Sequence, residues 1–406
     1  MELTQLPLEY QKALPLLQKL EDAGFEGYFV GGSVRDVLLG QPIHDVDIAT
    51  SAFPAEIKNI FPRTIDVGIE HGTVLVLVEE ESYEITTFRT ESTYQDFRRP
   101  DHVEFVRSLE EDLKRRDFTI NAFALKEDGA IIDLFGGLAD LNNQILRAVG
   151  NPYERFNEDA LRMMRGLRFV SQLGFTLEEK TKASIIENHA LLAKISVERI
   201  TIEFVKLLLG KNRNLGIKML LETNCYQFCP GLEGQSEALQ RFATLPEKQL
   251  LNEVQAWTLF IDQLKLEQEE IRSFLKGWKC SNQLIRSVQQ AYKGLQWRKT
   301  QPYSAMLLYE LQEEAITIVE SLLPYFGIEN QTPQSLVAYQ KLPIKSLTDL
   351  AVNGNDLMQT FNKKGGKWLK EALSLCEEVV IVGTIANERP LLLDYLATNH
   401  SELLSL

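Results

Sequence analysis

A pair of glycines at the end of a short apolar run most constrains how this chain folds. Residues 28–30 are Tyr-Phe-Val, and they are followed by Gly31, Gly32 and Ser33. Residues 34–39 suit the first turns of a helix. We therefore expect a strand, a tight turn and a helix whose N-terminal backbone N–H groups converge. Such a corner can bind phosphate, although a Gly-Gly-Ser sequence by itself is more often only a turn.

Two acidic residues follow the glycine turn at short range. Asp45 and Asp47 stand in His-Asp-Val-Asp-Ile, which we expect to be a strand, so both carboxylates should point to the same side. Carboxylates together with substrate phosphates are the ligands that Mg²⁺ prefers. An isolated Asp-x-Asp is usually a solvated strand end, but beside a phosphate-binding turn it favours nucleotidyl transfer.

A third carboxylate belongs to the alternating segment 83–88. There Glu84 shares a face with Thr86 and Phe88, and we expect a neighbouring strand to bring Glu84 beside the two aspartates. It could deprotonate an attacking hydroxyl or tune bound metal. An exposed strand glutamate is the more common outcome.

Three consecutive cations precede an aspartate in residues 114–117, just before an apolar segment that we expect to be a helix. Because a helix N-terminus favours anions, Asp117 suits a cap or an acceptor for a ribose hydroxyl. Arg115 or Arg116 would then contact a bound triphosphate. A plain surface run of charges is the alternative.

Residues 158–169 predict one helix that opens with acids and continues with arginines. Asp159 and Arg162 should lie one turn apart on one face, where a simple salt bridge is the usual result. A carboxylate acceptor beside an Arg donor would also pair with the Watson–Crick edge of cytosine or adenine, but not of uracil or guanine. Arg165 and Arg168 continue along the same stripe and could contact phosphates.

Length and composition predict more than one domain. The chain has 406 residues, of which 44% are hydrophobic. The first 150 or so mix strand and helix signals, and the chain from about residue 158 onward has helical periodicity. The net charge of −14 argues against a generally basic surface but allows a local one. No apolar stretch is long enough to span a bilayer, and neither a signal peptide nor a disulfide framework is indicated, so we expect a cytoplasmic protein.

These motifs, in this order and spacing, resemble the class II tRNA nucleotidyltransferases of the polymerase-β-like superfamily. The resemblance is strongest to the CCA-adding enzymes of the Bacillus type, which share the run at residues 109–122, Leu-Glu-Glu-Asp-Leu-Lys-Arg-Arg-Asp-Phe-Thr-Ile-Asn-Ala. It implies an α+β fold, with an N-terminal mixed α/β nucleotidyltransferase head and an all-helical neck, body and tail. We expect these four domains at residues 1–150, 151–215, 216–325 and 326–406.

The resemblance also implies residue roles. Asp45 and Asp47 would hold Mg²⁺, and Asp36 could be a structural partner of Arg35 and stays outside the catalytic set. The residues expected to bind the nucleotide are Gly32, Ser33, Arg35, Arg116, Asp117, Asp159, Arg162, Arg165 and Arg168, of which Asp159 and Arg162 would read the base. Residues 195–200 resemble the neck motif of the family.

The expected activity is template-independent addition and repair of the 3′-terminal CCA of tRNA from CTP and ATP, without a membrane partner. An intact polar loop at residues 89–106, with Tyr94, Asp96, Arg98, Arg99 and Asp101, favours full CCA addition over CC addition alone. An A-adding or CC-adding specialist remains the alternative, followed by a poly(A) polymerase or a small-molecule nucleotidyltransferase. Lys363, Lys364 and Lys367 could meet RNA phosphates. Assembly as a homodimer stays open. The only His-Asp pair is His44-Asp45, so we expect no phosphohydrolase activity.

Overall fold

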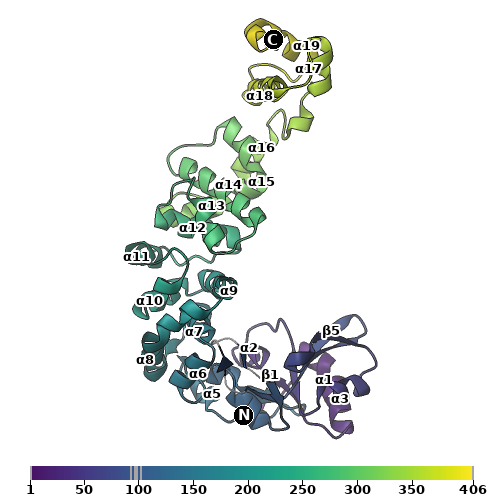
Figure 1. Ribbon diagram of the computed structural model, residues 1–406, viewed down its shortest axis with the longest axis vertical. Helices are drawn as coiled ribbons and strands as arrows, with labels where there is room; N and C mark the ends of the chain where they lie inside the picture. Colours follow the sequence, from purple (N-terminus) through teal and green to yellow (C-terminus); the bar gives the residue numbers. More distant parts are fainter. Residues whose placement is uncertain (1, 92–93, 96–98, 101–102, 405–406) are drawn as a thin grey trace. The chain divides into compact units, whose positions relative to one another are not determined.

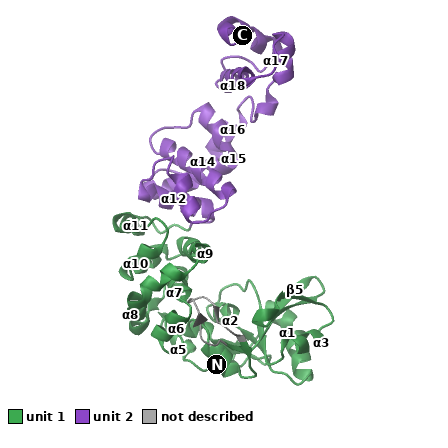
Figure 2. Cartoon of the chain, viewed as in Figure 1, with its two compact units in different colours: residues 1–249 green, residues 250–406 purple. Residues whose placement is uncertain are grey.

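The computed structural model describes residues 2–91, 94–95, 99–100 and 103–404. They form two compact units, Met1–Gln249 and Leu250–Leu406 (Figure 2). The division into head, neck, body and tail stays a prediction. Three residues of the predicted polar loop, Asp96, Arg98 and Asp101, lie outside the described residues.

A mixed sheet organises the N-terminal part of the first unit (Figure 1). In the described residues it has seven strands in the order β11-β10-β1-β2-β5-β4-β3. The β2–β5 pair is parallel and the other pairs are antiparallel. In sheet order the strands are Ile131–Asp133, Phe123–Leu125, Gly27–Val30, Asp47–Thr50, Glu81–Thr87, Thr73–Val78 and Thr64–Gly68. The strands expected near residues 28–30, 73–78, 83–88 and 130–134 are thus confirmed.

A hydrophobic core of this unit lies between one face of the sheet and helices α1 (Leu8–Asp22) and α3 (Pro54–Ile60). Leu17, Ile48 and Ile85 are fully buried in it. The rings of Tyr10 and Phe29 stack there with centroids 4.4 Å apart. Burial of these apolar side chains fixes the strands that carry the acidic residues of the site.

The glycine turn has the predicted form. Strand β1 ends at Val30, and helix α2 (Gly32–Leu38) begins two residues later. Gly31 has φ +77°, and a Cβ there would lie 3.2 Å from the Arg116 guanidinium and 3.6 Å from an Asp47 carboxylate oxygen. Glycine is therefore required both by the backbone conformation and by the close approach of two charged groups.

The expected strand around the two aspartates is shorter than predicted. Strand β2 begins at Asp47, and Asp45 lies before it in an exposed, irregular segment. In the β1–β2 ladder Asp47 pairs with Val30, the last residue of β1. Because Gly31 then turns the neighbouring chain away, residues before Asp47 have no antiparallel partner on that side. The alternation of side chains along a strand therefore does not determine where the Asp45 and Asp47 carboxylates lie relative to each other.

The basic run 114–116 ends a helix instead of preceding one. Helix α4 (Leu109–Lys114) stops at this run, and only the short 3₁₀ segment η2 (Thr119–Asn121) follows it. Cations at a helix C-terminus interact favourably with the helix dipole, which the sequence interpretation had reversed. The segment 89–106 contains two short antiparallel pairs, β6 (Arg89–Glu91) with β9 (Val103–Phe105) and β7 (Tyr94–Gln95) with β8 (Arg99–Pro100).

The remainder of the first unit is mainly helical, as predicted. The prediction of a single helix at residues 158–169 is wrong. Asp159 has φ −132° and ψ 102°, which are not helical, and it separates α6 from α7. One short parallel pair, β12 with β13, joins this region. The elements are α5 Gly137–Asn142, β12 Ile145–Leu146, α6 Pro152–Glu158, α7 Leu161–Leu173, β13 Thr176–Leu177, α8 Glu179–Asn188, α9 Val197–Leu208, α10 Arg213–Glu222 and α11 Ser236–Ala243.

The second unit consists of helices in its described residues. Much of its core gathers Leu311, Ile316, Trp368, Cys376 and Leu392 with neighbouring apolar side chains. Over the described stretches of the whole chain, no helix has the length and apolar character that crossing a bilayer demands. The α-helices are α12 Glu253–Leu264, α13 Ile271–Gly277, α14 Asn282–Arg298, α15 Ala305–Leu322, α16 Thr332–Gln340, α17 Gly354–Thr360, α18 Lys367–Ile381, α19 Arg389–Asn399 and α20 Ser401–Leu404.

Helix α7 is held against α10 by a close approach at a glycine. A Cβ on Gly216 of α10 would lie only 2.6 Å from the Cβ of Ser171 in α7. Helix propensity alone would make alanine about 1 kcal/mol better than glycine within a helix. The packing at Gly216 opposes that gain.

We expect Gly216→Ala to lower the free energy of unfolding by roughly 1–3 kcal/mol, because the added methyl must displace α7. Urea denaturation followed by circular dichroism measures the change. Gly354→Ala is the matched control, since the nearest atom to its Cβ would be 3.9 Å away. Unchanged or increased stability of Gly216→Ala would contradict this packing.

Candidate active site

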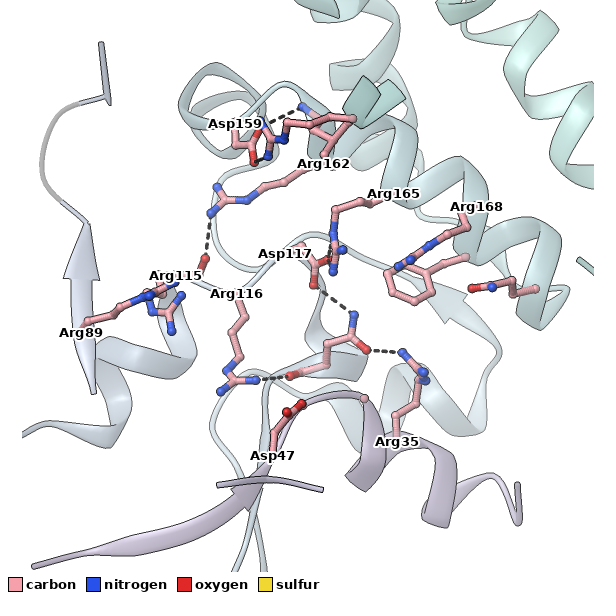
Figure 3. Close-up of a pocket in the computed structure, with 17 residues that line it drawn as sticks. Arg35, Asp47, Arg89, Arg115, Arg116, Asp117, Asp159, Arg162, Arg165 and Arg168 are labelled. Carbon is pink, nitrogen blue, oxygen red and sulfur yellow. Dashed lines mark hydrogen bonds and ion pairs between the residues drawn. The ribbon is translucent and has the colours of Figure 1, made fainter. Parts of the chain in front are cut away.

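A cavity of about 620 Å³ opens between the glycine turn and helix α7 (Figure 3). It brings together nine of the predicted site residues, which come from α2, β2, the segment after α4, the break between α6 and α7, and α7 itself. They are Gly32, Arg35, Asp47, Arg116, Asp117, Asp159, Arg162, Arg165 and Arg168.

Arginine dominates the charge of this cavity. Among the described lining residues eight are arginines and three are aspartates, although the chain as a whole carries −14. Guanidinium groups suit phosphate and carboxylate ligands because they offer several N–H donors in a fixed plane. The cavity is therefore built for an anionic ligand. The arginines are Arg35, Arg89, Arg115, Arg116, Arg162, Arg165, Arg168 and Arg199.

Arg35 is held from three directions. Its guanidinium donates to Asp36 through Nε at 2.9 Å and Nη2 at 2.7 Å, and to the side-chain oxygen of Asn121 at 2.6 Å. It also lies 5.1 Å from the centre of the Phe169 ring. Asp36 is thus the structural partner of Arg35, as the sequence allowed.

Asp112 anchors the two arginines of the basic run. This carboxylate is only 1% exposed and accepts from Arg115 at 2.7 Å and from Arg116 at 3.1 Å. Burial alone would raise the pKa of Asp112, but the two guanidinium groups together hold that pKa below its usual value. Asp112 therefore stays charged and fixes both arginines at the cavity.

Asp117 forms a second buried ion pair, with Arg165 of α7. One oxygen of Asp117 accepts from Arg165 at 2.6 Å, and the other accepts from the Phe118 N–H at 2.8 Å and the Asn121 amide at 3.0 Å. Burial opposes ionisation, but Arg165 and these hydrogen bonds keep the pKa of Asp117 well below its usual range. The aspartate couples the segment after α4 to α7.

Asp159 and Arg162 both line the cavity, each with its own partners. Asp159 lies just before α7 and accepts from the Leu161 N–H at 3.0 Å and from Arg199 at 2.8 Å. Arg162 donates to Glu158 at 2.7 Å and to the Arg115 carbonyl at 2.9 Å. Because the helix is broken at Asp159, Asp159 and Arg162 do not lie on one face of a single helix as predicted.

Arg168 lies deeper than the sequence suggested. It is 8% exposed, its Nε is 3.1 Å from Glu203 of α9, and its guanidinium lies 4.2 Å from the Phe169 ring centre. Burial lowers the pKa of Arg168 to about 10, although Glu203 opposes that shift. The partner of Arg168 in the structure is thus an acidic side chain of the protein itself.

The acidic residues meet at the edge of this cavity. The parallel register of β2 and β5 places Glu84 opposite Asp47, which confirms the expected neighbourhood. A second cavity, of about 480 Å³, is lined by Asp45, Asp47 and Glu84, and Asp47 lines both cavities. The surrounding protein raises the pKa of Asp47 by desolvation, and the Glu84 and Asp45 carboxylates raise it further while Arg116 opposes them.

This donor set fits a hard divalent cation only in part. Carboxylate oxygens are the right ligands, and mutual repulsion of the acids around Asp47 would be relieved by a bound cation. In the described residues, however, no three Asp, Glu, His or Cys side chains are arranged to hold a metal by themselves. Substrate or water oxygens would have to complete the coordination.

Ser33 stands apart from the other predicted residues. It is 5% exposed, and its hydroxyl donates to the Val30 carbonyl at 3.1 Å, within the turn itself. Conversely, the cavity includes residues to which sequence reasoning gave no role. Four of them lie within segments already singled out, at residues 89–106, 109–122, 158–169 and 195–200, whereas nothing in the local pattern marked Gln172. These residues are Arg89, Asn121, Phe169, Gln172 and Arg199.

The Asp117–Arg165 pair should make stability depend on pH. Asp117→Asn should lower the free energy of unfolding by roughly 1.5–3 kcal/mol at pH 7, because Arg165 loses its charged partner. A depressed pKa stabilises the fold above the unfolded value of about 3.9, and that contribution is lost as pH falls through the folded pKa. The difference between variant and parent should therefore shrink below about pH 4.

Urea titrations from pH 7 to pH 3 measure this dependence. Asp66→Asn is the control, because Asp66 pairs with Lys58 at 2.9 Å on the surface, where the loss should stay within about 1 kcal/mol. A deficit for Asp117→Asn that is the same at both ends of the pH range would exclude the ion pair as its cause.

Comparisons with known proteins agree with this geometry. A family model described as "Poly A polymerase head domain" matches residues 27–147, a tRNA nucleotidyltransferase domain 2 model matches residues 248–396, and "Probable RNA and SrmB-binding site of polymerase A" matches residues 174–235. The CCA-adding enzyme of Enterococcus faecalis is 58% identical over 99% of each chain. That of Pediococcus pentosaceus is 50% identical over 96% of this chain and 98% of its own.

A solved structure is similar over the same range. The Bacillus stearothermophilus CCA-adding enzyme, in complex with CTP, is 40% identical and superposes with a TM-score of 0.90 over 98% of this chain and 100% of its own. Identity of this extent, together with the arginine-lined cavity beside Asp47, leads to one conclusion: the chain belongs to the CCA-adding enzymes, a family of tRNA nucleotidyltransferases.

Proposed function

We propose that the chain adds and repairs the 3′-terminal CCA of tRNA, using CTP and ATP and releasing pyrophosphate. Its similarity to CCA-adding enzymes over nearly the full length supports the acceptor and the nucleotides. The observation that carries the chemistry is the position of Asp47, at the junction of the arginine-lined cavity and the acidic cavity. An anionic nucleotide and a cation-binding carboxylate would meet there.

The proposed metal residues are Asp45 and Asp47. Mg²⁺ held there would stabilise the attacking and leaving oxygens of a nucleotidyl transfer. Glu84, opposite Asp47 in the β2–β5 register, is the secondary candidate and would accept the proton of the attacking hydroxyl. In that transfer the tRNA 3′ oxygen bonds to the α-phosphorus, the bond to the β-phosphate breaks, and pyrophosphate leaves.

The triphosphate is assigned to the part of the cavity around the glycine turn. Gly32 allows a close backbone approach, and Arg35 and Arg116 flank it with guanidinium groups fixed by Asp36 and Asp112. The Ser33 hydroxyl already donates to Val30, so its part in phosphate binding is limited to shaping the turn. Asp117 acts by holding Arg165, and Arg168 by packing on Phe169 beneath the cavity.

The base is assigned to Asp159 and Arg162, which line the same cavity. Cytosine and adenine each present an amino donor beside a ring-nitrogen acceptor. A fixed carboxylate and a fixed guanidinium complement that pattern and reject the reversed pattern of uracil and guanine. The contacts to Arg199 and Glu158 support this assignment, because they hold both side chains in place without a nucleic-acid template.

The tail lysines are proposed to contact RNA phosphates. Lys364 and Lys367 are exposed near the start of α18, whereas Lys363 donates to the Leu403 carbonyl at 2.9 Å and lies 5.3 Å from the Trp368 ring. We assign the RNA contact to Lys364 and Lys367. A homodimer and a cytoplasmic location stay predictions.

Primer extension on three tRNA transcripts tests the activity. Transcripts that end at the discriminator base, after the first C and after the second C are incubated with Mg²⁺ and CTP, ATP or both. Extension by CC and then one A is the expected result. Arrest after CC, activity only on the CC-ended transcript, or a long A tract would each assign a different specialist, and transfer only to a small molecule would overturn the tRNA acceptor.

Asp47→Asn should reduce nucleotide incorporation by about 100-fold or more, because the metal loses a charged ligand at the reacting phosphate. Single-turnover incorporation of CMP measures the loss, with Asp66→Asn as the surface control. Incorporation within a few-fold of the parent would remove Asp47 from the metal site.

Asp159→Ala should relax base choice more than it weakens triphosphate binding. The variant loses the acceptor for the amino group of C or A, so the ratio of CTP to UTP incorporation should fall by roughly 10-fold or more. Competition between labelled nucleotides gives that ratio directly. A variant that rejects UTP and GTP as strictly as the parent would show that the base is read elsewhere.

A further inference from the structure

Asn121 lies between the guanidinium of Arg35 and the carboxylate of Asp117. It belongs to the 3₁₀ segment η2, is 6% exposed and lines the cavity. Its side-chain oxygen accepts from Arg35 at 2.6 Å, and its amide nitrogen donates to Asp117 at 3.0 Å. Its backbone carbonyl accepts from Arg116 at 3.4 Å. One residue thus contacts three of the predicted nucleotide-binding side chains.

These contacts form a continuous series of alternating charges across the cavity. From α2 the series runs through Asp36 and Arg35 to Asn121, and from there through Asp117 to Arg165 of α7. Asn121 is the neutral link between the two ion pairs. Without the Asn121 side chain, Arg35 of α2 would no longer be connected by hydrogen bonds to Asp117 and, through it, to Arg165 of α7.

The residue type follows from what the two neighbours require. A guanidinium offers only donors and an ionised carboxylate offers only acceptors, so the link must accept on one side and donate on the other. A short side-chain amide does both. Aspartate would satisfy Arg35 but place a second carboxylate against Asp117, and alanine or leucine would leave buried charged groups with fewer hydrogen bonds.

We propose that Asn121 is a positioning residue for the nucleotide triphosphate, acting through Arg35 and Arg116. This inference rests on the proposed function, which assigns those two arginines to the phosphates. It differs from a merely structural role, because the loss should appear in nucleotide binding and not only in stability.

Steady-state kinetics of Asn121→Ala test the proposal on a tRNA transcript that lacks CCA. The KM for CTP and for ATP should each rise by roughly 10-fold, with kcat reduced by less than about 3-fold and rejection of UTP unchanged. Asn142→Ala is the matched control, since Asn142 is an exposed asparagine at the end of α5. A lower kcat with unchanged KM, in proportion to lost folded protein, would overturn the proposal.

Asn121→Asp keeps the size of the side chain and supplies a second readout. The charged groups that face residue 121 are Arg35 from α2, with Arg116 and Asp117 from its own segment, and Asp140 of α5 bonds the neighbouring Thr119 at 2.7 Å. The introduced carboxylate would repel Asp117 when it is ionised, whereas its protonated form can donate as the amide does. Because Arg35 favours the ionised form, the KM of this variant for CTP and ATP should exceed that of the parent throughout the neutral pH range.

The outcomes separate this inference from the proposed function. If the parent chain adds no nucleotide to tRNA, the proposed function fails and the kinetic comparison has no basis. If the parent adds CCA and the KM values of both Asn121 variants stay within about 2-fold of that of the parent, Asn121 does not position the arginines. Thermal melting of both variants checks that the proteins compared are folded.

Discussion

Compensation of arginine charge by fixed acids is the constraint on which the site depends. Eight guanidinium groups line one cavity, and like charges at that density repel one another unless each is paired. Asp36, Asp112, Asp117, Glu158, Asp159 and Glu203 supply partners for seven of the eight at 2.6–3.1 Å. Because the acids neutralise the arginines without filling the cavity, the guanidinium faces stay available to an anionic ligand.

The paired acids also connect separate parts of the first unit. Asp36 lies in α2 and Asp112 in α4, whereas Asp159 separates α6 from α7 and Glu203 belongs to α9. The pairs of Asp117, Asp159 and Glu203 each join two segments of the chain, whereas Asp36 and Asp112 fix arginines of their own segment. The cavity is therefore shaped by several short contacts, and close packing at Gly216 sets the position of the helix that carries three of the arginines. Stability and site geometry have the same physical origin here.

Local sequence patterns predicted the elements that local forces decide. The glycine turn after Val30 follows from the Gly-Gly-Ser sequence between an apolar run and a helical segment, and β4 and β5 follow from their β-rich and alternating residues. The structure adds that Gly31 has a positive φ. Three local interpretations were wrong at element ends, and one of them concerned the basic run 114–116, which ends α4. Asp45 lies outside β2 because the partner strand ends at Val30. Asp159 breaks the expected helix, where it accepts from the Leu161 N–H and pairs with Arg199.

The sequence by itself determined the family resemblance, the order of sheet and helices, and the residue types that could bind metal, phosphate and base. These follow from periodicity and from motifs whose members lie within a few residues of each other. Only the tertiary structure decided which acid holds which arginine, that Ser33 turns to its own backbone, and that Asn121 links Arg35 to Asp117. Such contacts join residues up to 86 positions apart, and chain spacing does not specify which of many donors and acceptors will meet across a packed interior.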